Sequence, residues 1–213
     1  FVLKPFMPVG ESDGPIGAVA LARSINRAFG SKVLILSEKE CVEPIRAICL
    51  GAGLLPVPID VAVSVSQSIT LSPFPVDPIE AKQEAERIFQ EFDPVAMITL
   101  EKVGRNEKGV YHTSPGGDMS EWTAKVDLLF DMVREAGRPT IGIGDYGNEM
   151  GLGSLIDTVK RIAPTARQCA CPCGAGIATT VEADVPFVSA ISNWGAYGIC
   201  ACLAAMLGDR QIL

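Results

Sequence analysis

Residues 142–153, GIGDYGNEMGLG, combine acidic and amide side chains with five glycines, directly after an apolar run. Asp145 and Glu149 are four residues apart, so their carboxylates could converge on a hard cation or divide into a base and an acid. Asn148 adds an amide donor, and Gly144 with the other glycines would let the backbone bend towards a ligand. The local alternative is that Asp145 caps a helix and Glu149 lies in its first turn, where an acid is favourable. A cap requires neither the glycines nor Asn148, so we predict Asp145, Asn148 and Glu149 as catalytic, with Asp145 and Glu149 as candidate metal ligands.

Residues 101–120, EKVGRNEKGVYHTSPGGDMS, form a long polar stretch without a regular pattern. Loops of this length are usually functional or disordered. Arg105 suits a substrate carboxylate, because its planar guanidinium makes paired hydrogen bonds, and Asp118 is a further candidate for substrate binding. A solvated loop is the alternative, since charged residues are ordinary there. His112 is the only histidine in the chain, which excludes a multi-histidine metal site, and we interpret it as a bystander.

The stretch GESDGPIGA, residues 10–18, places two acids before a helix expected to begin near Gly14. The first amides of a helix are unpaired and bind anions, helped by the helix dipole. We therefore predict Glu11, Asp13 and Gly14 as substrate-binding residues. The alternative is that Asp13 only caps this helix. The stretch matches neither a Walker A sequence nor GxGxxG.

A second polar stretch, SNWGAYG at 192–198, follows another apolar run. Asn193 can donate and accept hydrogen bonds, Ser192 adds a hydroxyl, and the Trp194 indole could form a pocket wall. We predict all three as substrate-binding residues. A capped helix start with a packed tryptophan is the alternative.

The stretch CACPC at 169–173 would, as a strand, point three cysteines the same way, which suggests a soft-metal site. However, C-x-C-x-C is weaker evidence than paired C-x-x-C, and no second cluster accompanies it. Cys200 and Cys202 lie in an expected apolar helix and are interpreted as small core residues. Structural cysteines without metal are therefore the favoured interpretation.

The whole chain has the composition of a well-cored globular protein. It has 213 residues, 48% of them hydrophobic and 20% charged, and a net charge of −7. The acidic balance argues against nucleic-acid binding, and no apolar run is long enough to predict a membrane span. Seven cysteines, an odd number, do not form a secreted disulfide framework, so we expect a reducing compartment, the cytoplasm or the mitochondrial matrix. The chain starts inside an apolar run and ends without a tail, so flanking segments are expected.

Short apolar runs alternate with amphipathic helical patterns along the chain, which predicts an α/β fold. We expect a three-layer sandwich with a mostly parallel, doubly wound sheet, formed by residues 1–213 as a single domain. The expected strands are 1–6, 32–36, 95–100, 140–143, 167–171 and 187–191, with one or two more within 56–76. The expected helices run from about 14 to 30, 42 to 50, 77 to 92, 120 to 137, 150 to 161 and 192 to 207. In such sheets ligands bind beyond the carboxyl ends of the strands, so the polar loops after the strands should form one cleft.

Four segments together resemble one family. ESDGPIGAVALARSI, ITLEKVGRNEKGVYH, TIGIGDYGNEMGLGS and EADVPFVSAISNWGAYG are similar, in order and spacing, to the C-terminal domain of D-glutamate cyclase and its relatives. The resemblance covers roughly residues 10–205. The chain departs from the family pattern at Ser12 and Lys102, and at Tyr146 and Ala196, where the family has glycines. Tyr146 could narrow the pocket and change the substrate.

The resemblance implies a lyase that cyclises D-glutamate to 5-oxo-D-proline and water. Our own hypothesis for the mechanism makes Asp145 or Glu149 the base and Glu101 the acid, with Arg105 or the helix start after Asp13 as the site for the α-carboxylate. We expect D-glutamate or a similar acidic metabolite as substrate and no organic cofactor, with room for a divalent cation, Mg²⁺ or Mn²⁺. No nucleic-acid or membrane partner is expected, and homo-oligomerisation is left open. Two alternatives remain: a non-catalytic domain that binds a small carboxylate or phosphorylated metabolite, and another metal-assisted enzyme for a small acidic substrate.

Overall fold

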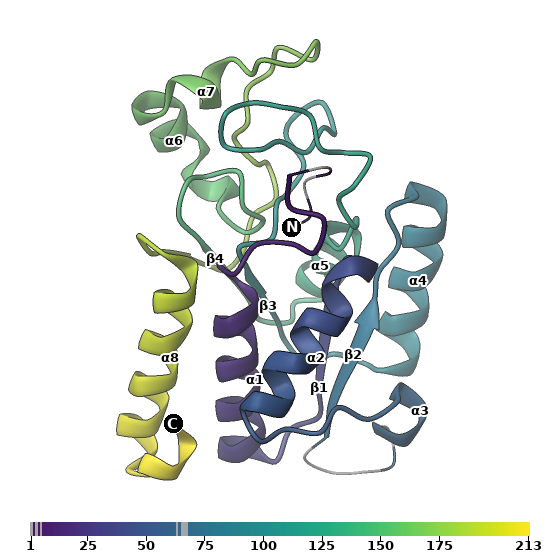
Figure 1. Cartoon of the computed structure of the whole chain (residues 1–213). Helices are drawn as coiled ribbons and strands as arrows, with labels where there is room; N and C mark the ends of the chain where they lie inside the picture. Colours follow the sequence, from purple (N-terminus) through teal and green to yellow (C-terminus); the bar gives the residue numbers. More distant parts are fainter. Residues whose placement is uncertain (1, 3, 5, 63, 65–67) are drawn as a thin grey trace.

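The chain folds into parallel strands with helices packed around them, which confirms the α/β prediction (Figure 1). The computed structural model describes residues 2, 4, 6–62, 64 and 68–213. Strand β1 (Val33–Ser37) pairs in parallel with β2 (Ile69–Pro73). A second sheet contains β3 (Met97–Leu100), β4 (Thr140–Gly144) and β5 (Val185–Val188), also parallel and in that order. Within the described residues the strands therefore form two sheets rather than the single sheet expected, and the three-layer sandwich and single domain stay predictions.

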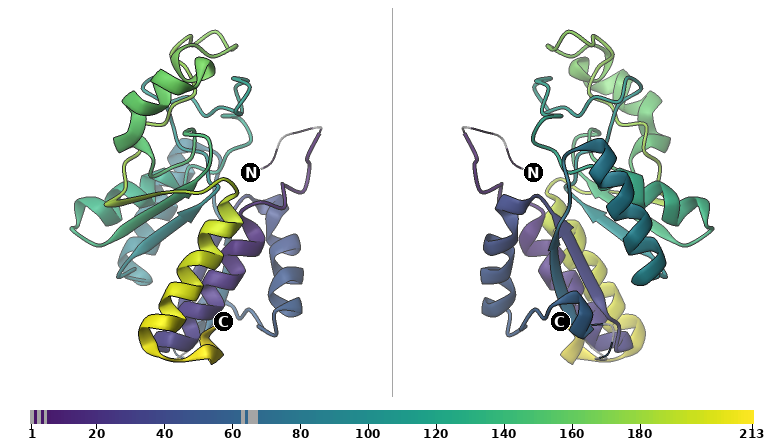
Figure 2. Two further views of the ribbon diagram at one scale, coloured as in Figure 1. Left: turned by 90° about the vertical axis from the view of Figure 1, so that its left-hand side faces the viewer. Right: turned by 90° about the vertical axis from the view of Figure 1, so that its right-hand side faces the viewer.

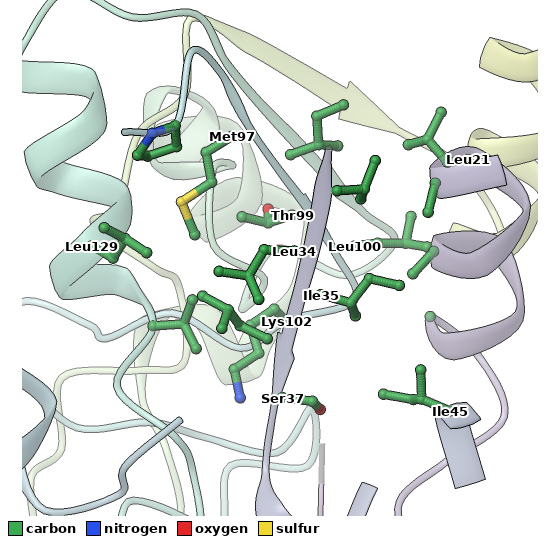
Figure 3. Close-up of a pocket in the computed structure, with 18 of the residues that line it drawn as sticks. Leu21, Leu34, Ile35, Ser37, Ile45, Met97, Thr99, Leu100, Lys102 and Leu129 are labelled. Atoms are coloured by element: carbon green, nitrogen blue, oxygen red, sulfur yellow. The ribbon is translucent and has the colours of Figure 1, made fainter. Parts of the chain in front are cut away.

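The two sheets are separated by a cavity of about 500 Å³ that both β1 and β3 line. Figure 3 shows Leu34 and Met97 on one side of β1, with Ile35 and Leu100 on the other. The lining is mostly aliphatic, although Lys102 and the carboxylates of the neighbouring loops also contribute to it. Residues of β1 and β3 thus line a cavity where a continuous sheet would have backbone hydrogen bonds.

Helices pack on both sides of these strands. Helix α1 (Pro15–Phe29) lies beside α8 (Ser192–Leu207), with α2 (Val42–Gly51) on its other flank (Figures 1 and 2). Helices α4 (Pro78–Glu91) and α5 (Asp127–Glu135) pack together on the opposite side. The shorter helices are α3 (Ile59–Ala62), α6 (Ile156–Ile162) and α7 (Pro164–Arg167), with 3₁₀ turns at Lys39–Cys41, Gly153–Leu155 and Arg210–Ile212. In the described residues no helix is long and apolar enough to cross a membrane.

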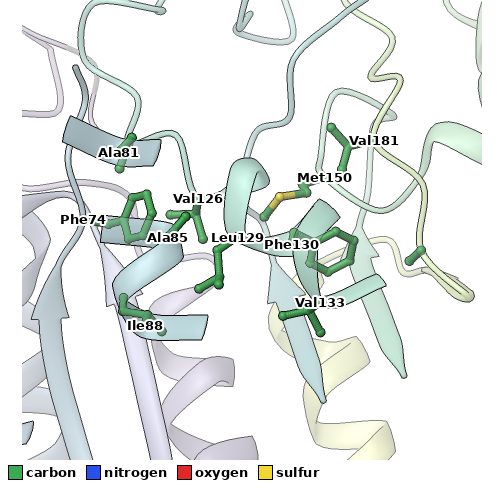
Figure 4. Close-up of a cluster of buried hydrophobic side chains, with 12 residues drawn as sticks. Phe74, Ala81, Ala85, Ile88, Val126, Leu129, Phe130, Val133, Met150 and Val181 are labelled. Carbon is green, nitrogen blue, oxygen red and sulfur yellow. The ribbon is translucent and has the colours of Figure 1, made fainter. Parts of the chain in front are cut away.

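The main core lies between α4, α5 and the strands (Figure 4). Ala81, Ala85 and Ile88 are buried at helical spacing, as the pattern predicts, and the Asp77 carboxylate accepts hydrogen bonds from two amides at the start of α4. Phe130 and the rest of the buried face of α5 pack against them. Burial of these apolar faces is the main favourable term that holds the layers together.

Several expected boundaries are wrong. Helix α5 begins at Asp127 rather than Ser120, because residues 120–123 form a turn and a bend, and Lys125 donates to the backbone carbonyls of Ser120 and Thr123. The helix expected from Met150 begins only at the 3₁₀ turn from Gly153, since Gly151 and Gly153 donate to the Val181 carbonyl. Residues 167–171 are not a strand but the end of α7 and a bend. The strand expected over 1–6 falls partly outside the described residues, and its described members are not in a strand.

Candidate active site

Three carboxylates from three segments converge beyond the ends of the strands. Asp13 precedes α1, Glu101 follows β3 and Asp145 follows β4, and one carboxylate oxygen from each lies within 4.8 Å of the others. This matches the expectation that the loops after the strands meet in one place. The group fits a hard divalent cation, which takes oxygen ligands. The sequence predicted Asp145 and Glu149 as the metal ligands. In the structure the carboxylates that lie close to Asp145 in this group are those of Asp13 and Glu101, and Glu149 is not one of the three.

Helices α1 and α8 are held at this site by reciprocal capping. The Asp13 carboxylate accepts hydrogen bonds from the backbone N–H groups of Ser192 and Asn193, at 3.1 and 2.8 Å. In return the Asn193 Oδ1 accepts from the N–H groups of Gly14 and Gly17, at 3.0 and 2.7 Å. The alternative interpretation was that Asp13 only caps α1. The structure shows that Asp13 caps α8. Asn193, predicted to bind substrate, instead uses its side chain to join the two helices.

Glu101 is the buried member of the carboxylate group. Its backbone φ is 53°, in the left-handed region that residues other than glycine rarely adopt. Its carboxylate accepts a hydrogen bond from the Ser192 hydroxyl, and only 8% of the residue is exposed. Burial, opposed by the hydrogen bond from Ser192 and reinforced by the charges of Asp145 and Asp13, raises the pKa of Glu101 to about 7. Near neutral pH this group can therefore both hold and release a proton.

Glu149 lies beneath the same cluster, almost fully buried. It accepts a hydrogen bond of 2.6 Å from the N–H of Gly147. Burial first, and then the charge of Glu101, raises the pKa of Glu149 to about 8. Burial, followed by the charge of Asp13, also raises the pKa of the more exposed Asp145. Burial likewise raises the pKa of Glu11, to about 7. The pKa values of Glu11, Glu101, Asp145 and Glu149 are therefore all raised.

The glycines of the 142–153 loop make room for the protein itself rather than for a ligand. A Cβ on Gly144 would lie 2.6 Å from the Glu149 Cβ, and one on Gly142 would lie 2.5 Å from the Gly151 Cα. The loop folds back over β4, and these close approaches place the Glu149 carboxylate. The sequence predicted that these glycines clear space for a ligand. The geometry instead favours a role in close packing of the loop against β4.

Gly142→Ala is expected to destabilise the protein by about 3 kcal/mol, the upper end of the usual cost of overpacking, because the clash is with backbone. Urea unfolding measures the change. Gly198→Ala is the matched control: it lies inside α8 with open space around it, so alanine should be neutral or stabilising there. Equal stabilities of the two variants would contradict the close-packing account.

Other predicted residues lie outside the carboxylate group. The Arg105 guanidinium is already paired with Asp127, at 2.6 Å, and with Asp131, so it is not available to a substrate carboxylate. Asp118 is exposed and accepts from the N–H of Ser120. Trp194 is 61% exposed at the start of α8.

Asn148 also has a different place from the one predicted. Its side-chain amide donates to the His112 carbonyl at 2.9 Å, which ties the glycine loop to the 101–120 loop. Single-sequence patterns cannot reveal such a contact, because the two residues are distant in the chain.

A buried ion pair next to the site has no counterpart in the sequence predictions. Lys102 pairs with Glu38, which follows β1 and is 1% exposed. Burial alone would raise the pKa of Glu38, but the charge of Lys102 and hydrogen bonds from Lys102 and the Ala124 N–H lower it to about 2. The only available signal was that each residue lies two positions after an apolar run.

His112 is not a bystander. Its imidazole is fully buried against the thiols of the CACPC segment, and one ligand atom from each of His112, Cys169, Cys171 and Cys173 lies within 4.8 Å of the others. The interpretation of His112 as a bystander was wrong, because this histidine from the distant loop lies beside all three cysteines of the segment.

The fold and the site define an α/β protein whose loops bring carboxylates together beyond the ends of parallel strands. A family model described as D-glutamate cyclase-like, C-terminal, matches residues 1–212, and the chain belongs to this family. Human mitochondrial D-glutamate cyclase is 28% identical over 202 residues, covering 92% of this chain. That alignment covers 30% of the human protein, so the chain spans less than a third of its length.

Proposed function

We propose that this chain is an enzyme of the cyclase type that converts D-glutamate to 5-oxo-D-proline and water. The observation that carries the proposal is the convergence of Asp13, Glu101 and Asp145, with Glu149 buried beneath them, in a member of the D-glutamate cyclase-like family. The human relative is named for this reaction, although it is much longer than this chain.

The reaction forms a bond between the α-amino nitrogen and the γ-carboxyl carbon and breaks one carbon–oxygen bond. The ammonium group must first lose a proton, and Asp145 is the more exposed carboxylate of the cluster and the proposed base. The departing oxygen must gain protons, and Glu101, with its raised pKa, is the proposed acid. Glu101 supplies one proton to the departing oxygen, and the nitrogen passes its second proton to the same oxygen, so that water leaves. Transfer of the first proton from Asp145 to Glu101 then resets the site.

In the alternative to this proton transfer, Asp13, Glu101 and Asp145 would be the ligands of a divalent cation. A cation bound there would polarise the γ-carboxylate and favour the ionised forms of the three acids. Glu149 supports this arrangement from below through its bond to Gly147. Because Arg105 is paired with Asp127 and Asp131, the α-carboxylate must be bound elsewhere. The start of α1 is not the proposed place, because the N–H groups of Gly14 and Gly17 already donate to Asn193.

The decisive experiment is incubation of the purified chain with D-glutamate and, separately, L-glutamate, with and without Mg²⁺ or Mn²⁺, while 5-oxoproline is followed by NMR. Product from the D-isomer alone is expected. Dependence on the cation would assign the three acids as ligands, and independence would assign them to proton transfer. No product, together with thermal stabilisation by the ligand, would instead indicate a non-catalytic binding domain.

A further inference from the structure

One cluster of side chains is separate from the carboxylates and has no part in the proposed reaction. His112 comes from the 101–120 loop, and Cys169, Cys171 and Cys173 come from the bend and turn that follow α7. The His112 Nε2 lies 3.1 Å from the Cys171 Sγ and 3.5 Å from the Cys173 Sγ. The Cys169 Sγ lies 3.5 and 3.3 Å from those two sulfur atoms.

These distances are close to those of a tetrahedral metal site. Around a zinc ion with Zn–S bonds of about 2.3 Å, neighbouring ligand atoms lie about 3.8 Å apart. Three thiolates and one imidazole form a common ligand set of structural zinc, whereas Mg²⁺ and Mn²⁺ prefer oxygen ligands. We propose that His112, Cys169, Cys171 and Cys173 bind one zinc ion.

The surroundings of the cluster support a metal site. The Asn106 side-chain amide lies 3.5 Å from the Cys173 Sγ and also donates to the Gly176 carbonyl at 2.7 Å. Such N–H groups orient and stabilise metal-bound thiolates. A disulfide is a poorer account, because it would join two of the three cysteines and leave the third and His112 without a role.

The two segments that meet at the cluster contain little regular structure of their own. No helix or strand occurs between Glu101 and α5 or between α7 and β5 in the residues described. They approach through backbone, since Ala170 donates to the Gly116 carbonyl and a Cβ on Gly116 would lie 2.8 Å from the Ala170 nitrogen. Long irregular segments cost conformational entropy to order, and a metal that binds only the folded state offsets that cost.

The zinc site would also fix the loop that carries the acids. The carbonyl of His112 accepts the hydrogen bond from Asn148, which lies next to Glu149. The ion would thus hold the 101–120 loop, the cysteine segment and the glycine loop in one arrangement. This role is structural and is independent of which reaction the carboxylates catalyse.

Metal analysis of the purified chain, prepared without chelator, tests the proposal. About one zinc per chain is expected in the wild type, and Cys171→Ser and His112→Ala should lose it. Cys202→Ser and Asp145→Asn are matched controls that should keep it, because Cys202 is an exposed residue of α8 and Asp145 belongs to the carboxylate group. Chelation should lower the melting temperature of the wild type.

Cobalt substitution of the wild type gives a second measurement that does not require any variant to fold. Cobalt bound by three thiolates and an imidazole should show thiolate charge-transfer bands and the visible bands of tetrahedral cobalt, saturating at about one equivalent. Absence of both zinc and the cobalt spectrum would overturn the proposal. So would zinc retained by both cluster variants, or a disulfide among residues 169, 171 and 173 in mass spectra of the fresh protein.

Discussion

Glu101→Gln is expected to reduce the rate of D-glutamate cyclisation by about 10²–10⁴-fold, the usual contribution of a positioned acid or base. Glutamine has nearly the same shape and can still accept a hydrogen bond from the Ser192 hydroxyl. It cannot release a proton or provide a negative charge to a cation. The loss should therefore appear in kcat, while the melting temperature stays near that of the wild type.

The control for this variant is Glu107→Gln, which lies on the same loop and pairs at the surface with Lys160. It should leave turnover unchanged. If Glu101 acts as the acid, wild-type turnover should also fall as the pH rises above about 7, because only the protonated carboxyl can donate. Near wild-type turnover by Glu101→Gln would remove Glu101 from the mechanism.

Lys102→Met is expected to cost about 3–5 kcal/mol of unfolding free energy, because it leaves the Glu38 charge buried without its partner. The double variant Glu38→Gln with Lys102→Met should recover much of this loss, since it buries no charge and glutamine can still accept from Ala124. Lys160→Met breaks an exposed pair and should cost less than about 1 kcal/mol. Urea unfolding at neutral pH measures the unfolding free energies of these three variants and distinguishes the three expected changes.

The pH dependence of stability gives an independent check on the same pair. The folded-state pKa of Glu38 is lowered from its ordinary value of 4.5 to about 2. Its contribution is therefore complete above pH 4.5 and is lost as the pH falls towards 2. The double variant should lose this part of the acid dependence. An unfolding curve for Lys102→Met that matches the wild type at all pH values would show that the pair does not stabilise the fold.

The sequence by itself determined the local elements and the segments that carry chemistry. Helical spacing at Ala81, Ala85 and Ile88 located α4, and Asp77 marked its first turn, because caps and amphipathic faces depend on residues a few positions apart. The polar stretches after the apolar runs contained all three acids that converge. Four ordered motifs also indicated the family that the comparison confirms.

Only the tertiary structure decided which side chains meet. Asp13 caps a helix almost 180 residues away, Arg105 is neutralised by acids on α5, and His112 joins three cysteines from another segment. None of these contacts has a sequence period, because each depends on how separate loops pack beyond the strand ends. The glycines of residues 142–153 give a similar case. The sequence shows where the backbone is approached closely, but only the tertiary structure shows that the approaching atoms belong to the protein and not to a ligand.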